Sequence, residues 1–218
     1  MKHLFADAPF NYKHKLGAIN SINWARILAQ TVYYFHAYFA ARKQLPKDSN
    51  VELQFVVPTG NFGDILAGYY AKRMGVPMTR LSIATNANDI LARFWRSGRY
   101  EKVASPEPGV AAAAPADGAS DGKQATADAS GVKETLSPAM DILVSSNFER
   151  LLWYLALEAQ GNDTAAAGAD LRAWMASVKA DGRAVVPTKV LELARRDFIA
   201  ERVSDEQVII SKPIDYIS

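Results

Sequence analysis

A glycine-containing turn between two apolar segments is the clearest chemical feature of this sequence. The turn covers residues 58–64 and reads PTGNFGD. Gly60 and Gly63 allow positive φ angles and a close approach of the backbone to a ligand. Several backbone amides would then point at one spot in front of a helix, where the helix dipole adds to their attraction for a phosphate group. The turn therefore predicts a phosphate site.

The pattern of the turn narrows the class of phosphate ligand. It lacks the Gly-Lys-Ser/Thr ending of a nucleoside-triphosphate loop, which argues against an ATPase of that type. It is also not Gly-x-Gly-x-x-Gly, so it carries no fingerprint of a dinucleotide fold. A small phosphate-bearing cofactor remains. The alternative is a glycine-assisted connection between a strand and a helix, with no ligand.

A second polar group, at residues 20–23, lies where a long apolar helix is expected to begin. Asn20 or Ser21 could cap this helix, and free amides at a helix N-terminus could instead favour an anionic ligand. Apolar residues spaced for one helical face follow, and the remaining faces are also apolar. We therefore expect this helix to be buried on most of its sides. The residues expected on the principal face are Ile22, Leu28, Val32, Phe35 and Phe39.

Alternating strands and helices should position the turn. Residues 53–57 and 81–85 are predicted strands, and residues 65–75 and 90–96 are predicted helices. We expect Asn88-Asp89 to cap the second helix. This order predicts an α/β fold with a parallel sheet and flanking helices. Ligands of such sheets lie beyond the C-terminal ends of the strands, where the turn is placed.

The composition changes after the second helix. Residues 104–131 are rich in alanine, proline, glycine and serine and contain no aromatic residue, which predicts a disordered insert. Helices are expected again at residues 146–155, 167–180 and 188–196, the last two as a helical appendage. We therefore divide the chain into an α/β cofactor-binding region (1–103), the insert, and a continuation of that region with the helical part (132–218).

Charge and composition exclude several classes of function. Lysine and arginine number 25 against 23 aspartates and glutamates, a net charge of +2 that gives no support for binding to nucleic acid or to a membrane surface. Cysteine is absent, and the three histidines lack the spacing of metal ligands, so no metal site is expected. No signal peptide or membrane-spanning segment is predicted. We expect a cytoplasmic protein.

Four stretches of the sequence resemble threonine synthase of the fungal type. They are residues 15–35, 55–75, 81–91 and 135–158. The resemblance implies a fold-type II pyridoxal-phosphate enzyme that converts O-phospho-L-homoserine and water to L-threonine and phosphate. It also implies two sets of site residues. Gly60, Asn61, Phe62 and Asp64 would bind the cofactor, with their amides on its phosphate, and Asn20, Ser21 and Asn23 would form part of the active-site wall that contacts substrate.

Two motifs of that family have no counterpart in this sequence. The family's Schiff-base lysine lies in a Phe-Lys-Asp-type segment, and the only Lys-Asp pair here, Lys47-Asp48, lies in a polar turn. A later Asp-Pro-His-Thr segment is also missing. We therefore predict no catalytic lysine in this chain, and little or no threonine synthase activity from the chain alone. The alternatives are a non-catalytic module that binds phosphate or cofactor, and a fragment that does not fold by itself.

Overall fold

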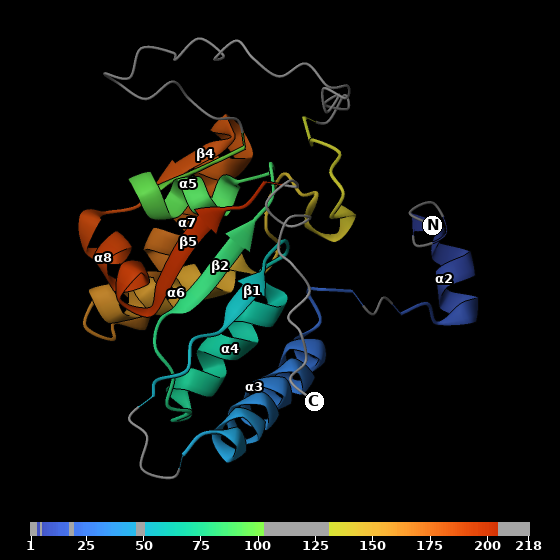
Figure 1. The fold of residues 1–218 in the computed structure, drawn as a ribbon. Coiled ribbons are helices and arrows are strands. Elements are labelled where there is room, and N and C mark those ends of the chain that lie inside the picture. Colours follow the sequence, from blue (N-terminus) through green and yellow to red (C-terminus); the bar gives the residue numbers. More distant parts are fainter. Residues whose placement is uncertain (1–3, 5, 18–19, 47–50, 103–130, 205–218) are drawn as a thin grey trace, which may run out of the picture.

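A parallel three-stranded sheet lies at the centre of the chain (Figure 1). The computed structural model describes residues 4, 6–17, 20–46, 51–102 and 131–204. Strand β2 (Leu81–Thr85) lies between β1 (Val56–Pro58) and β5 (Phe198–Arg202). Both neighbours run parallel to β2. The expected α/β arrangement is therefore confirmed.

Strand β2 forms where the sequence predicts it, because its apolar side chains alternate with smaller ones. Leu81 and Ile83 are fully buried, as expected for the middle strand of a sheet covered by helices. Strand β1 is shorter than the predicted strand at residues 53–57. Its preceding residues nevertheless run beside β2, since the carbonyl oxygens of Leu53 and Phe55 accept hydrogen bonds from the amides of Thr79 (3.0 Å) and Ser82 (2.9 Å).

Helices follow the first two strands directly, as the alternation predicts. Helix α4 (Gly63–Arg73) follows β1, and α5 (Ile90–Ser97) follows β2. Helix α5 ends at Gly98, whose φ of 73° is the left-handed conformation that glycine adopts readily. Asp89 occupies the N-cap position of α5, but its side chain makes no capping hydrogen bond.

The C-terminal helices are α6 (Phe148–Ala159), α7 (Thr164–Asp181) and α8 (Thr188–Asp197). Helix α7 begins three residues before the predicted start, because the Asp163 carboxylate accepts hydrogen bonds from the amides of Ala165 and Ala166. Helix α8 leads straight into β5. The predicted helical part is therefore joined to the sheet, and it supplies one of the sheet's three strands.

A second, antiparallel strand pair was not predicted. It joins β3 (Arg99–Glu101) to β4 (Arg183–Val185). The described chain also contains two short elements, α2 (Ala8–His14) and the 3₁₀ helix η1 (Pro138–Met140). Residues 104–130 of the predicted insert, Lys47-Asp48 and the tail from residue 205 lie outside the described residues.

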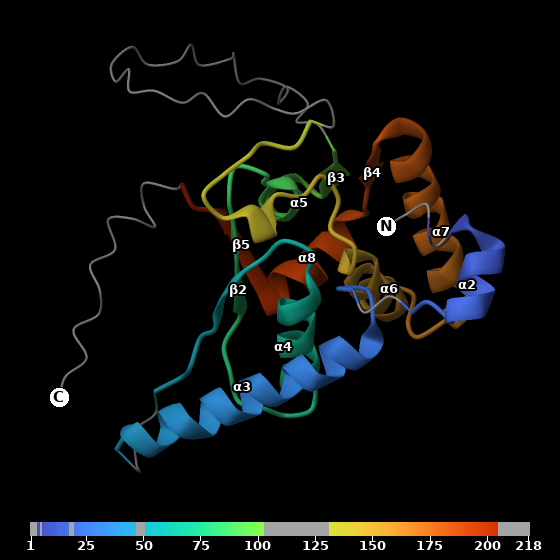
Figure 2. The same cartoon turned by 90° about the vertical axis from the view of Figure 1, so that its right-hand side faces the viewer.

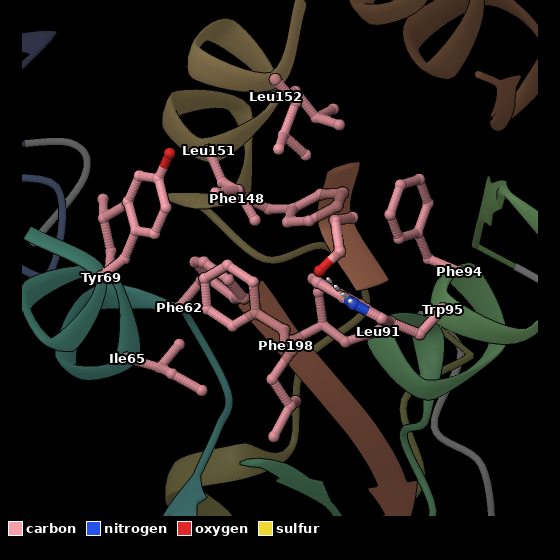
Figure 3. Close-up of a cluster of buried hydrophobic side chains, with 14 of the residues drawn as sticks. Phe62, Ile65, Tyr69, Leu91, Phe94, Trp95, Phe148, Leu151, Leu152 and Phe198 are labelled. Carbon is pink, nitrogen blue, oxygen red and sulfur yellow. Dashed lines mark hydrogen bonds between the residues drawn. The ribbon is translucent and has the colours of Figure 1, made fainter. Parts of the chain in front are cut away.

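An aromatic cluster joins the helices to the sheet (Figure 3). The ring of Phe62, from the start of α4, lies 5.4 Å from Phe148 of α6, 6.1 Å from Trp95 of α5 and 5.9 Å from Phe198 of β5 between ring centres. Buried aromatic pairs at these distances stabilise a core beyond the area that they bury. One cluster therefore fixes the positions of four elements around the turn that precedes α4.

Helix α3 (Trp24–Gln44) is less buried than the sequence predicts. It runs along the outside of the molecule next to α4 (Figure 2). Its buried face carries Ile27, Thr31 and Tyr34. Most of the face expected to be buried is exposed, including Val32, with 62% of its surface accessible. The expectation of burial on most sides is therefore wrong for the described chain, in which α4 covers only one side.

Candidate functional site

The turn at residues 59–62 lies between the C-terminal end of β1 and the first residue of α4. Phe62 occupies the N-cap position of α4 with a left-handed φ of 62°, and no side chain caps the helix. Gly60 and Gly63 do not have positive φ angles. The prediction that these two glycines supply the left-handed conformation is therefore wrong. Phe62 takes it instead, because burial of its ring in the aromatic cluster holds the backbone there.

Gly60 permits a close approach to its backbone, as predicted. The group that approaches it is the backbone of another segment of the protein. A Cβ atom at Gly60 would lie 2.8 Å from the carbonyl oxygen of Ala139 and 3.1 Å from Cα of Met140. Both belong to the 3₁₀ helix η1. Any larger residue at this position would have to displace η1 or the turn.

A cavity of about 270 Å³ borders the turn. Residues 58–65 form one side of it, and Ser21, Arg26, Gln30 and Ala139 complete its lining. The amides of the first residues of a helix have no acceptor within the helix. In α4 these amides belong to Gly63, Asp64 and Ile65, all of which line the cavity. The turn thus combines a cavity with an uncapped helix N-terminus.

Two serines and an asparagine after η1 hold the turn through hydrogen bonds. The Ser145 hydroxyl donates to the carbonyl oxygen of Gly60 (2.8 Å). The backbone amide and the side-chain amide of Asn147 both donate to the carbonyl oxygen of Asn61 (3.1 and 2.9 Å). The Ser146 hydroxyl donates to Oδ1 of Asn61 (3.2 Å). The side chain of Asn61 is therefore engaged with protein.

The predicted wall residues separate into two kinds. Ser21 lines the cavity, and its hydroxyl oxygen lies 3.3 Å from that of Ser146. Asn23 is the N-cap of α3 and accepts a hydrogen bond from the amide of Ala25 (2.9 Å). Asn20 is exposed and accepts from the amide of Ile22 (3.0 Å). The expectation that Asn20 or Ser21 caps α3 is therefore wrong, and of the three only Ser21 lines this cavity.

Arg26 and Gln30 are cavity residues that the sequence reasoning missed. They are four residues apart and therefore lie on one face of α3, a spacing that could have singled them out once the start of the helix was known. Arg26 brings a positive charge to a cavity whose lining also includes the acidic residue Asp64. Together with the N-terminus of α4, this charge favours an anionic ligand.

Asp64 places a carboxyl group at the same cavity. Desolvation raises the pKa of this carboxyl, and the neighbouring Tyr34 hydroxyl offsets part of the rise. The Tyr34 hydroxyl also donates a hydrogen bond to the carbonyl oxygen of Asp64 (3.0 Å), which ties α3 to the first turn of α4. Burial, in turn, raises the pKa of the Tyr34 hydroxyl.

Comparison with known proteins identifies close relatives along almost the whole chain. A threonine synthase from Schizosaccharomyces pombe is 53% identical over 96% of this chain. The chain is homologous to threonine synthases. No family model matches it. Both this homology and the parallel α/β architecture bear out the expected resemblance.

Two solved threonine synthases share the fold of the described chain. The crystal structure from yeast matches 94% of this chain with a TM-score of 0.74 and 49% identity. The structure from Brucella melitensis, which has PLP bound, matches 93% with a TM-score of 0.69 and 40% identity. These matches confirm the fold expected from the fold-type II enzymes.

The homology covers only part of each relative. The chain spans 37% of the S. pombe protein, and 34% and 35% of the yeast and B. melitensis chains.

Within the described residues, none of the helices has the length and apolar character required to cross a membrane.

Proposed function

We propose that this chain provides the phosphate-binding part of a pyridoxal-phosphate site of the threonine synthase type. The observation that carries the proposal is the cavity between α3 and the uncapped N-terminus of α4, with Arg26 in its lining. A phosphate dianion suits this set of donors, because the free amides and the cation both attract negative charge.

Each residue of the predicted cofactor set has a distinct part in this proposal. Gly60, Asn61 and Asp64 contribute backbone at the cavity, and their amides are the phosphate donors we expect. The ring of Phe62 is buried in the core, so Phe62 acts through its backbone alone. Ser21 contributes a hydroxyl group to the wall, which suits contact with the substrate or the cofactor.

The reaction we propose for the site is the one that the resemblance to threonine synthase implies, conversion of O-phospho-L-homoserine and water to L-threonine and phosphate. When bound, pyridoxal phosphate supplies a ring that accepts electron density as a proton leaves the carbon beside the substrate amine. The residues of this chain bind and orient the phosphate end. No Phe-Lys-Asp segment occurs in these 218 residues, so we propose that the chain alone turns over little or no substrate.

Binding of two forms of the cofactor tests the proposal. Isothermal titration should show binding of pyridoxal 5′-phosphate and at least tenfold weaker binding of pyridoxal, which lacks the phosphate. Equal affinity for both compounds, or no binding of either, would contradict the assignment. A parallel assay of phosphate release from O-phospho-L-homoserine, with cofactor added, should give a background rate. Robust turnover would show that the chain carries its own catalytic lysine.

A further titration, with inorganic phosphate, distinguishes the alternative, a non-catalytic module that binds phosphate compounds in general. The absence of the lysine segment favours this alternative. It predicts that inorganic phosphate and pyridoxal phosphate bind with similar affinity. A preference for pyridoxal phosphate over inorganic phosphate supports a site shaped for the whole cofactor.

A further inference from the structure

Asn147 connects three separate parts of the candidate site. It is fully buried at the N-terminus of α6. Its side-chain nitrogen donates to the carbonyl oxygens of Ser21 (2.8 Å) and Asn61 (2.9 Å). Its side-chain oxygen accepts a hydrogen bond from Arg150 (2.7 Å). One planar amide therefore joins the residues before α3, the turn before α4, and α6.

Arg150 reinforces this connection from the same helix. Its guanidinium group donates to Oδ1 of Asn147 and also to the carbonyl oxygen of Ile22 (2.6 Å). The two neighbouring carbonyls of Ser21 and Ile22 are thus held by two side chains at the start of α6, Asn147 and Arg150, that are hydrogen-bonded to each other. The position of the wall residue Ser21 relative to the turn depends on this pair.

The geometry of the peptide bond links these contacts to the amides of the turn. In a trans peptide the carbonyl oxygen of one residue and the N–H of the next point in opposite directions. Ser145 and Asn147 hold the carbonyl oxygens of Gly60 and Asn61. The amides of Asn61 and Phe62 must therefore point away from the Ser145–Asn147 segment. That segment does not line the cavity, whereas Asn61 and Phe62 do.

We propose that Asn147 is a positioning residue of the phosphate site. It orients the amides of the turn through the Asn61 carbonyl, and it holds Ser21 beside the turn, without touching the ligand. This inference rests on the function proposed above. Its chemistry requires an amide side chain, since both contacts to carbonyl oxygens need N–H donors while the contact to Arg150 needs an acceptor.

Asn147→Asp tests the requirement for N–H donors. The substitution keeps the size of the side chain and the acceptor for Arg150, but it places a carboxylate oxygen against the carbonyl oxygens of Ser21 and Asn61. We expect affinity for pyridoxal 5′-phosphate to fall at least tenfold. Hydrogen exchange of amides 21–24 and 60–65 should accelerate, while exchange in β3 and β4 stays as in the wild type.

Two further variants keep the inference testable if Asn147→Asp does not fold. Ser145→Ala removes only the contact to the Gly60 carbonyl, and we expect a three- to tenfold loss of affinity with faster exchange at residues 60–63. Gln160→Ala removes an exposed hydrogen bond to Asp170 at the other end of α6, and it should change neither measurement. This variant controls for general effects on the helix.

The outcomes separate this inference from the proposed function. If the wild type does not bind pyridoxal phosphate, the proposed function fails, and hydrogen exchange alone decides whether Asn147 positions the turn. Unchanged affinity and exchange in a folded Asn147→Asp variant would overturn the positioning role. Acceleration of exchange throughout the sheet by the same factor as in the turn would also overturn it, because that result describes a general loss of stability.

Discussion

Phe62 has a backbone role and a side-chain role in the turn before α4. A left-handed φ angle costs a residue other than glycine about 1 kcal/mol or more. Burial of a phenylalanine ring in a core contributes about 3–5 kcal/mol, judged from substitutions by alanine. The buried ring of Phe62 therefore outweighs the strain of its backbone, and it fixes the turn in the conformation that leaves the N-terminus of α4 uncapped.

Gly60→Ala should weaken ligand binding through a steric effect. Its Cβ would lie 2.8 Å from the carbonyl oxygen of Ala139, so η1 and the turn must separate. We expect a tenfold or greater loss of affinity for pyridoxal 5′-phosphate, measured by isothermal titration. Gly17→Ala is the matched control, because a Cβ at Gly17 meets no atom within 4 Å. Equal affinities of the two variants would argue against the close packing of η1 on the turn.

At the scale of elements, α3 shows why a pattern of apolar residues does not always identify the buried face. Its sequence is apolar on several faces, so spacing alone selects the wrong one. The contact that decides the face lies on another element. Gly68 of α4 leaves room for the Tyr34 ring, and a Cβ at Gly68 would lie 2.6 Å from that ring. This complementarity between two helices is a tertiary feature, which local sequence does not reveal.

Two substitutions on α3 test which face is buried. Ile27 is fully buried and Val32 is 62% exposed. Ile27→Ala should lower the free energy of unfolding by about 2–4 kcal/mol because it leaves a cavity. Val32→Ala should change it by less than about 0.5 kcal/mol. Urea denaturation of both variants measures the difference, and a larger loss for Val32→Ala would contradict the assignment.

An ion pair between α6 and α8 gives a pH-dependent prediction. Glu158 forms a two-point contact with Arg196, with one N–O distance of 3.0 Å. The guanidinium group lowers the pKa of the Glu158 carboxyl below its ordinary value. A lowered pKa stabilises the folded chain above the unfolded pKa, and this contribution disappears as the pH falls through the folded pKa. Because both groups are partly exposed, the contribution is only about 0.5–1 kcal/mol.

Glu158→Gln should therefore reduce the free energy of unfolding at pH 7 by about 0.5 kcal/mol. The difference from the wild type should shrink toward zero as the pH falls below about 4. Thermal unfolding over a series of pH values measures it. Glu192→Gln, at an exposed position on α8, is the control and should have little effect at pH 7. A Glu158→Gln effect that stays constant down to pH 3 would contradict the ion pair.

At the scale of the whole molecule, elements defined by local signals were predictable from the sequence. Strand β2, helix α5 and the turn at residues 58–64 carry such signals in their own residues. Strand β5 does not, because it ends in the charged pair Glu201-Arg202, and only pairing with β2 makes it a strand. Of the cavity, the turn and Ser21 were predictable. Arg26, Gln30 and Ala139 reach it through the packing of α3 and η1.

Residues 131–141 are held to the end of β2 by a polar network centred on Asp141. The Asp141 carboxylate accepts hydrogen bonds from Asn86 (2.7 Å), from Asn88 (3.1 Å) and from the amide and hydroxyl of Thr135 (3.0 and 2.7 Å). This network fixes the segment that ends in η1, and therefore one wall of the cavity. The position of η1 thus depends on contacts made after the insert.

A deletion of the insert tests whether the position of η1 is independent of the insert. Lys102 and Gly131 line one cavity of about 230 Å³, so a short Gly-Ser linker should span them in place of residues 104–130. We expect the melting temperature and the affinity for pyridoxal 5′-phosphate to stay close to those of the full chain. A large loss of affinity in a folded deletion variant would show that the insert contributes to the site.

The most direct measurement of the central claim is a titration of ¹⁵N-labelled protein with pyridoxal 5′-phosphate, followed by amide chemical shifts. The largest changes should fall on the amides of residues 61–65, with smaller changes at Ser21 and Arg26. Pyridoxal should leave the 61–65 amides nearly unchanged. Changes centred elsewhere, for example along β5, or none at residues 61–65, would contradict a phosphate site at the N-terminus of α4.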